Sequence, residues 1–204
     1  NIRKTGLIAM TLRDDDQLIE AKLIDAGEDI MIGTRNGMAI RFNETDVRVT
    51  GRSSMGVRGI SLDADDEVIG MQKLSQGDYV LVVSEKGMGK LTHVDEFKAQ
   101  KRGGKGLHCY RITEKTGKLV GFKLTSKERE IMLITNEGVI IRMSLKDAKD
   151  IGRNTSGVKF MNIDPDSTTV IASIAKVRES TTEAYEAELA ETEADPEESD
   201  ELNS

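Results

Sequence analysis

Short apolar runs alternate with polar turns along residues 1–177, and the same order of runs recurs about every 50 residues. Runs of four to eight β-branched and aliphatic residues between turn residues are typical of strands. Each period therefore predicts four short strands. The first follows a basic cluster, as in LIAMTL (7–12). The second strand is LIEAKL (18–23), VIGMQKL (68–74), LVGFKL (119–124) or VIASIAKV (170–177), the third is DIMIGT (29–34), YVLVVS (79–84) or IMLITN (131–136), and the fourth is MAIRF (38–42), MGKLTH (88–93) or VIIRMS (139–144).

Three series of landmarks share this period, so the repeat does not depend on one motif. The glycines that close the basic clusters are Gly6, Gly56, Gly106 and Gly157, at spacings of 50, 50 and 51. A second glycine series is Gly37, Gly87 and Gly138, and an apolar series is Leu12, Leu62, Ile112 and Ile163. Four strands per period is typical of propeller-like blades. We predict an all-β domain over residues 1–177, in which about three and a half blades form a partial ring within a longer protein.

The turns of the first period have a clear local signal. Asn36-Gly37 lies between two apolar runs and predicts a two-residue hairpin with a type I′ turn. Residues 94–100 have weak helical character, but the other periods carry ETDVRV and LKDAKD there. We therefore expect a connecting loop or a single helical turn in this stretch.

Charge divides the chain into two parts. Residues 178–204 hold eleven acids and one base, a net charge of −10, so residues 1–177 carry −7 − (−10) = +3. The acidic end has few large apolar residues and is predicted to be a disordered tail. Two roles remain open for it: a solubilising end, or a polyanion that competes with another polyanion for the basic body.

Composition narrows the class of protein. No apolar run approaches the ~20 residues of a membrane span, so no membrane partner is expected. The chain has a single cysteine, Cys109, which indicates no disulfide framework and favours a cytoplasmic location. Trp is absent and aromatic residues make up 3% of the chain, which argues against a base-stacking platform for single strands.

The basic clusters are the candidate binding sites. We name them box 1 (residues 2–6, IRKTG), box 2 (51–56, GRSSMG), box 3 (100–106, QKRGGKG) and box 4 (152–157, GRNTSG). Glycine lets the backbone approach a ligand closely, successive amides can form an anion-binding nest, and Lys and Arg donate to phosphate oxygens. Regularly spaced basic loops on a curved rim would suit duplex DNA, which is itself a regular polyanion. The candidate residues are Gln100, Lys101, Arg102, Gly103, Gly104, Lys105 and Gly106 in box 3, with Arg52, Arg58, Arg153, Lys159, Arg3 and Lys4 in and beside the other boxes.

A structural explanation of boxes 2 and 4 stays open, in which their glycines connect strands and their arginines are merely solvated. Enzyme chemistry finds little support. Box 3 lacks the Gly-x-x-x-x-Gly-Lys-Ser/Thr pattern of a phosphate-binding P-loop. His108 and Cys109 are neighbours in a predicted strand and point to opposite faces, so a shared metal or a nucleophile pair is not expected. We assign no catalytic residue and no metal ligand.

The QKRGGKG stretch resembles the seven-residue box of the DNA gyrase A family of type IIA topoisomerases. IGTRNGMAIRF, TDVRVTGRSSMGVRGI, EKGMGKLT and GRNTSGVKFM also resemble, in order, the blades of that family's C-terminal domain. The resemblance covers residues 1 to about 177, and an acidic tail is a common ending in the family. In the family the defining box lies in the first blade, whereas here the best copy lies in a late blade. We therefore interpret box 3 as an additional wrapping loop, with the principal box expected upstream.

The resemblance implies a β-pinwheel, a ring of four-stranded blades that exchange strands, around whose basic edge duplex DNA is wrapped. Strand passage by the whole enzyme then introduces negative supercoils. It also implies two partners in an A2B2 holoenzyme, namely a B subunit plus a second copy of the A subunit. The cofactors would be ATP, held by the B subunit, and Mg²⁺ at the cleavage site, with none in this chain, which is expected to be non-catalytic by itself. Two alternatives are the equivalent domain in the A subunit of topoisomerase IV, which decatenates DNA, and a propeller that serves as a protein-interaction platform.

Overall fold

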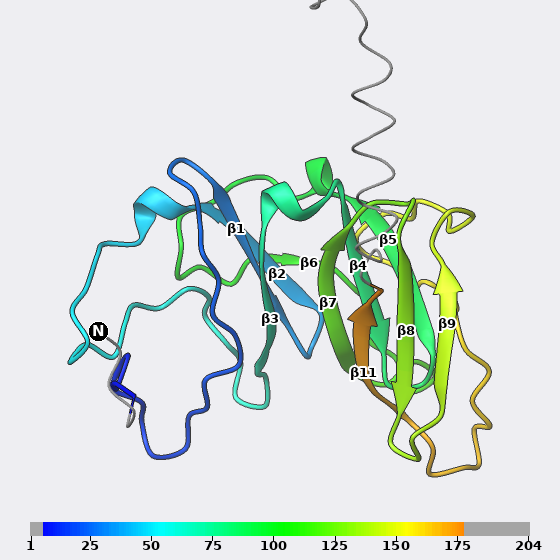
Figure 1. The fold of residues 1–204 in the computed structure, drawn as a ribbon. Coiled ribbons are helices and arrows are strands. Elements are labelled where there is room, and N and C mark those ends of the chain that lie inside the picture. Colours follow the sequence, from blue (N-terminus) through cyan, green and yellow to red (C-terminus); the bar gives the residue numbers. More distant parts are fainter. Residues whose placement is uncertain (1–5, 178–204) are drawn as a thin grey trace, which may run out of the picture.

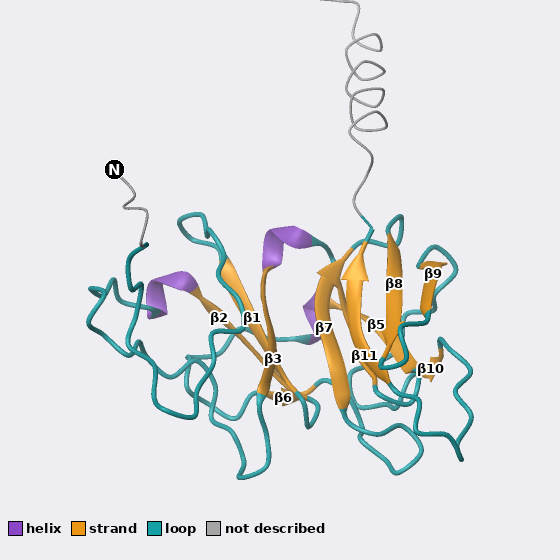
Figure 2. Ribbon diagram, turned by 60° about the horizontal axis from the view of Figure 1, so that its bottom comes forward, coloured by secondary structure: helices purple, strands orange, loops and turns teal. Residues whose placement is uncertain are grey.

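The computed structural model describes residues 6–177 and contains three antiparallel sheets in that range. Figure 1 shows the sheets side by side, with the segment before the first strand (blue) forming an irregular loop whose last part passes beside β3. No α-helix occurs among the described residues, and Figure 2 shows how strands and loops dominate them. The all-β prediction is confirmed. The predictions for Arg3, Lys4 and the acidic tail fall outside the described residues.

Each sheet is one blade and is built on a hairpin. Blade 1 has the order β3-β1-β2-β6, blade 2 the order β10-β5-β4-β7, and blade 3 the order β11-β8-β9. In blade 1 the strands are β1 (Asp29–Thr34), β2 (Met38–Asn43), β3 (Val68–Lys73) and β6 (Leu107–His108). In blade 2 they are β4 (Tyr79–Ser84), β5 (Met88–His93), β7 (Leu119–Thr125) and β10 (Val158–Lys159), and in blade 3 they are β8 (Glu130–Thr135), β9 (Ile140–Ser144) and β11 (Ile171–Lys176).

Every blade is assembled from more than one sequence period. The hairpin β1–β2 belongs to the first period, β3 to the second, and β6 to the third. Blade 2 follows the same rule one period later, since β7 and β10 flank the hairpin β4–β5. A hairpin thus takes one neighbour from the next period and a two-residue strand from the period after that. This is the strand exchange of a pinwheel.

The pairing of each hairpin with strands of later periods explains why some predicted strands are short or absent. The first strand of a period was expected over six residues, but β6 and β10 each have two, and residues 7–12 and 57–62 form none. Residues 18–23 also form no strand, contrary to prediction. These segments would pair with a hairpin of an earlier period, and none is described within residues 6–177. Consequently Leu7, Ile8 and Leu23 remain exposed.

The hairpin at Asn36-Gly37 is present, but its predicted turn type is wrong. No described residue other than glycine has a positive φ, so Asn36 cannot adopt the type I′ conformation. In this turn only Gly37 has a left-handed backbone, at φ 83°. Longer hairpin loops commonly end on a residue with a left-handed backbone. Its N–H donates to the Thr34 carbonyl, and the Thr34 hydroxyl accepts from the N–H of Met38.

Single 3-10 turns follow three of the strands. They are η1 (Glu44–Asp46), η2 (Leu74–Gln76) and η3 (Val94–Glu96). The expectation of a loop or a single turn at residues 94–100 is therefore confirmed. Both η1 and η3 come directly after the outer strand of a hairpin and lead the chain toward the next box.

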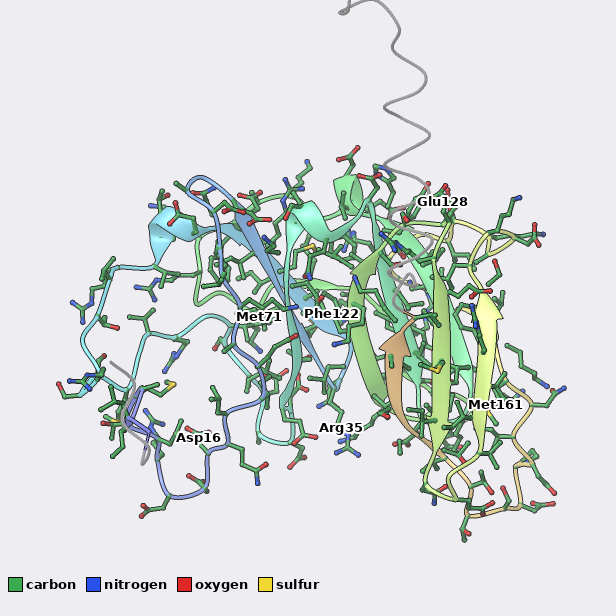
Figure 3. The ribbon with its side chains drawn as sticks, in the orientation of Figure 1. Asp16, Arg35, Met71, Phe122, Glu128 and Met161 are labelled. Atoms are coloured by element: carbon green, nitrogen blue, oxygen red, sulfur yellow. The ribbon has the colours of Figure 1, made fainter. Side chains whose placement is uncertain are left out.

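Neighbouring blades lock through a large side chain against a glycine. Phe122 on β7 is fully buried and covers Gly33 on β1 and Gly70 on β3, where a methyl group would clash with its ring or backbone. Figure 3 labels Phe122 at this junction. Ile174 covers Gly121 in the same way between blades 3 and 2. The blades therefore pack as interlocking sheets rather than as independent units.

We predict that Phe122→Ala lowers the free energy of unfolding by about 3–5 kcal/mol, because it opens a cavity between blades 1 and 2. Urea unfolding of both proteins measures this. Val139→Ala is the matched control, since Val139 is 47% exposed and its truncation should change stability by no more than about 0.5 kcal/mol. Similar losses in the two variants would contradict the interlocking role of Phe122.

Candidate functional site

Boxes 3 and 4 dock on the hairpins of blades 1 and 2 in the same way. The N–H of Gln100 donates to the carbonyl of Arg41 on β2 at 2.7 Å, and the N–H of Ile151 donates to that of Leu91 on β5 at 2.9 Å. Arg41 and Leu91 occupy equivalent positions of their hairpins, so each box enters its docked position through an equivalent backbone bond. Both boxes then end in a left-handed glycine.

Those closing glycines need their missing side chain. Gly106 has φ 76° and Gly157 has φ 71°, and a Cβ at either would clash with the carbonyl of the outer hairpin strand, that of Ala39 or of Gly89. The close approach allows β6 and β10 to begin at the next residue. The spacing of Gly106 and Gly157 in the sequence thus reflects two equivalent docking points.

Successive boxes are also joined to each other. In each case the acceptor is the carbonyl of the residue that lies two positions before the closing glycine of a box. The donor is the N–H of the residue that lies five positions after the closing glycine of the preceding box. The three bonds are Thr11 N–H to Ser54 at 3.2 Å, Ser61 N–H to Gly104 at 2.8 Å, and Arg111 N–H to Thr155 at 2.9 Å. The sequence period is therefore converted into a continuous row of basic loops, which we call the box track.

One arginine per box strengthens this junction in boxes 3 and 4. Arg102 donates through Nη1 to the carbonyl of Arg58 at 3.0 Å, and Arg153 donates through Nη1 to that of His108 at 3.0 Å. Arg58 and His108 both lie two residues after the closing glycine of the preceding box. Arg102 also donates through Nε to the carbonyl of Asp46 at 2.7 Å. Each of these two arginines, which were predicted as phosphate ligands, links its own box to the segment that follows the preceding box. We call them clasps in this sense.

The other box cations differ in how free they are. Lys101 is exposed and has no partner within the described part of the chain, and the same holds for the side chains of Arg52, Arg58 and Lys159. Lys105 pairs with Asp63 at 2.8 Å, and the hydrogen bond to that carboxylate raises the pKa of Lys105. Both partners are 71% exposed, so the pair leaves the ammonium accessible. Gln100, Gly103 and Gly104 are half-buried and shape the loop.

Lys90 belongs to the site although the sequence analysis did not single it out. It lies on β5 with its side chain fully buried, beneath box 4. Its ammonium donates to the carbonyls of Gly152 and Arg153 and to the Thr155 hydroxyl, at 2.7 Å for Gly152 and 3.1 Å for Thr155. The available signal was a lysine in MGKLTH at the position that isoleucine occupies in MAIRF.

Other chemistry is sparse in the described residues. Cys109 is buried, and burial raises the pKa of its thiol to about 12, so a thiolate nucleophile is disfavoured. His108, the last residue of β6, is exposed, whereas Cys109 after it is buried, so the two side chains do not share a site. No group of three or more acidic, His or Cys side chains in residues 6–177 could hold a metal ion. The described part of the chain also has no helix with the length and apolar character that crossing a bilayer requires.

Comparison with known proteins divides the chain with the same period of about 50 residues. A family model described as "DNA gyrase C-terminal domain, beta-propeller" matches residues 1–25, 28–75, 78–126 and 129–176. The A subunit of DNA gyrase from Ureaplasma parvum serovar 3 is 44% identical over 164 residues, which are 80% of this chain and 20% of the relative. The A subunit of DNA gyrase from Staphylococcus aureus strain MRSA252 is 40% identical over 92% of this chain and 21% of its own length. The chain spans about a fifth of the length of these curated relatives.

Solved structures resemble the fold over most of the chain. A structure of a DNA gyrase A C-terminal domain matches with a TM-score of 0.78 and 27% identity, and covers 86% of this chain and 59% of that one. The crystal structure of a C-terminal domain of DNA topoisomerase IV matches with a TM-score of 0.80 and 25% identity, and covers 92% and 58%. The pinwheel architecture is therefore shared with both kinds of domain.

We predict that Gly106→Ala destabilises the docked box 3 by about 1–3 kcal/mol, because it combines a left-handed φ with a clash against the Ala39 carbonyl. Gly51→Ala is the control, since no atom lies within 4 Å of a Cβ added there and its φ is not left-handed. Hydrogen exchange of the amides in residues 100–108 should accelerate in the first variant. Unchanged exchange in Gly106→Ala would contradict the docking role of this glycine.

Proposed function

The chain belongs to the DNA gyrase C-terminal domain family, and from that premise we propose that it binds duplex DNA along the box track and bends it. The observation that carries the proposal is the repeated bond between successive boxes, which places exposed basic side chains at regular intervals on one connected backbone. A duplex is a regular row of phosphates, and affinity for such a polyanion comes mainly from neutralised phosphates.

The cations divide into two roles in this proposal. Lys101, Arg52, Arg58 and Lys159 are exposed and free to meet phosphates directly, and Lys105 exchanges Asp63 for a phosphate oxygen. Arg102 and Arg153 hold the spacing between boxes and keep their remaining N–H groups for the duplex. Contacts of this kind position a duplex without reading its sequence, so we expect binding with little base preference.

Several boxes have to act together if the DNA is to be bent. Bending a site of about 20–30 bp costs on the order of 1–6 kcal/mol, which one loop with one free lysine does not offset. A track of connected boxes spreads that cost over several phosphate contacts. The clasps matter here, because a row of independently mobile loops would lose more conformational entropy on binding.

In the whole enzyme, we propose that this bend presents a DNA crossover for strand passage and so supports negative supercoiling. The proposed holoenzyme contains a B subunit plus a second copy of the A subunit in the cytoplasm, with ATP and Mg²⁺ acting outside this chain. The 40–44% identity to gyrase A relatives favours this role over decatenation by a topoisomerase IV, whose domain shares the fold at 25% identity. A protein-interaction platform would instead show no salt-sensitive binding to DNA.

We predict that the double variant Lys101→Ala/Lys105→Ala binds duplex DNA about 10- to 100-fold more weakly at 0.1 M salt, because each lost phosphate contact lowers the salt slope by about 0.9. Fluorescence anisotropy across a salt series measures both the affinity and the slope. Adding Arg102→Ala should weaken binding further and should also lower thermal stability, because that variant breaks a clasp.

The matched control is Lys115→Ala/Lys118→Ala, which removes the same charge outside the boxes. It should leave the slope nearly unchanged. Equal losses in the two double variants would mean that net charge rather than the box track binds DNA. Ligation of a relaxed circle in the presence of the protein then tests bending, since a wrapped duplex shifts the linking number.

We further predict that deletion of residues 179–204 tightens duplex binding, most clearly at low salt. Residues 179–204 hold eleven acids and no base, and this tail would compete with phosphates for the boxes. The same salt series, run on the deleted and intact proteins, measures the effect. Identical affinities at every salt concentration would leave the tail a solubilising segment.

A further inference from the structure

Boxes 3 and 4 dock in equivalent positions with different residues at the centre of the loop. Box 3 has Gly103 and Gly104 at its centre, and Gly103 is left-handed at φ 82°. Box 4 has Asn154 and Thr155 at the same positions, and neither has a positive φ. The backbone of box 4 must therefore follow a different path, and its inward-facing carbonyls need donors, because buried carbonyls without partners are costly.

Side chains of blade 2 and of the segment that follows β6 supply those donors. Thr92 donates to the carbonyl of Ile151 at 2.7 Å, Lys90 to those of Gly152 and Arg153, and Tyr110 to that of Ser156 at 2.6 Å. In blade 1 the position of Lys90 is held by Ile40, whose methyl group lies near Gly104. No side chain among the described residues donates to the carbonyls of Lys101 or Arg102. Of the two docked boxes, only box 4 therefore has a buried lysine that donates to its carbonyls.

We propose that Lys90 is a positioning residue that turns the backbone amides of box 4 outward to bind DNA phosphates. A trans peptide is planar, so its N–H points away from its carbonyl oxygen. Because the carbonyls of Gly152 and Arg153 point inward to the ammonium, the N–H groups of Arg153 and Asn154 point outward. Asn154 is exposed, and its N–H has no partner among the described residues.

An anionic oxygen already occupies one of these outward amides. The N–H of Arg153 donates to Oε2 of Glu96 at 2.9 Å. A carboxylate presents the same kind of oxygen as a phosphate, so the geometry of this amide suits an anion. Lys90 cannot itself reach DNA, because it is fully buried, and it acts through the loop that it holds. This inference rests on the proposed function, since it assigns a residue to the same DNA-binding track.

If the charged form of Lys90 holds box 4, the affinity of the protein for DNA should depend on pH. Burial lowers the pKa of Lys90 to about 8, against the opposing effect of Glu96 and with Arg153 nearby. Cys109 and Tyr110 also face it, and burial raises the pKa of each, so both stay neutral below pH 9. Above pH 8 the neutral amine has two N–H donors for three acceptors. Box 4 should then lose its fixed geometry, and DNA binding should weaken.

The contribution of Lys90 to the free energy of unfolding rises with pH, whereas DNA affinity is expected to fall. An unfolded lysine titrates near pH 10.4, so between about pH 8 and 10.4 the unfolded chain binds more protons than the folded one. Folding therefore becomes more favourable as pH rises through this window, as far as Lys90 is concerned. A loss of DNA affinity with rising pH cannot then be ascribed to unfolding driven by this residue.

The experiment compares Lys90→Met with Ile40→Met in the 204-residue chain, with a duplex of random sequence as the probe. Lys90→Met keeps an unbranched apolar chain and removes the ammonium, and Ile40→Met changes the equivalent position of blade 1. At pH 7 and 0.1 M salt we expect about tenfold weaker binding for Lys90→Met, because a hydrogen bond from a positioned amide to a phosphate is lost, and no change for Ile40→Met. Adding Arg153→Ala to Lys90→Met should cost less than Arg153→Ala costs alone.

The pH series is the second arm and needs no variant. Binding by the unmodified protein should weaken about tenfold between pH 7 and 9.5, and Lys90→Met, if folded, should lose that dependence. A flat pH profile in the unmodified protein, or a folded Lys90→Met with unchanged affinity, overturns the proposal; if Lys90→Met does not fold, the pH profile decides. If the unmodified protein binds no DNA at low salt, the proposed function fails first. If Lys101→Ala/Lys105→Ala weakens binding and Lys90→Met does not, the role of Lys90 alone is refuted.

Discussion

The structure depends on backbone pairing between segments that lie one and two periods apart. A hairpin such as β1–β2 has two open edges, and each is closed by a strand from a later repeat, β3 on one side and β6 on the other. Unpaired backbone groups in a buried edge are costly, so each blade is complete only when its later neighbours have folded. The blades are therefore linked by hydrogen bonds as well as by packing.

This exchange also creates the site. β6 and β10 pair with a hairpin directly after a box, so the box that precedes each of them lies on that hairpin, with its closing glycine against the hairpin backbone. The bond from Ser61 to Gly104, repeated from Arg111 to Thr155, then fixes one box against the segment that follows another. Fold and function consequently use the same contacts. A change that loosens the docking of a box would alter both the blade and the spacing of the cations.

The two docked boxes show that the same docked position on a hairpin can be reached with different backbone paths and different chemistry. Box 3 uses left-handed glycine over an apolar Ile40, and box 4 uses a buried ammonium under a loop of ordinary residues. A buried charge is tolerated there because three oxygens surround it, one of which is the hydroxyl of Thr155. A sequence motif defined by glycine and basic residues therefore describes only one of the two solutions.

The sequence by itself determined the period, the hairpins and the location of the basic boxes, because strands, turns and charge clusters are local patterns of side chains. The hairpin β4–β5 and the single turn at Val94 follow directly from those patterns. Tertiary structure decided which period completes which blade, why residues 7–12 and 18–23 form no strand, and that Arg102 holds a neighbouring box. It also decided the role of Lys90. These outcomes depend on partners such as those 44 and 65 residues away, and the pattern around a residue carries no information about a partner at that distance.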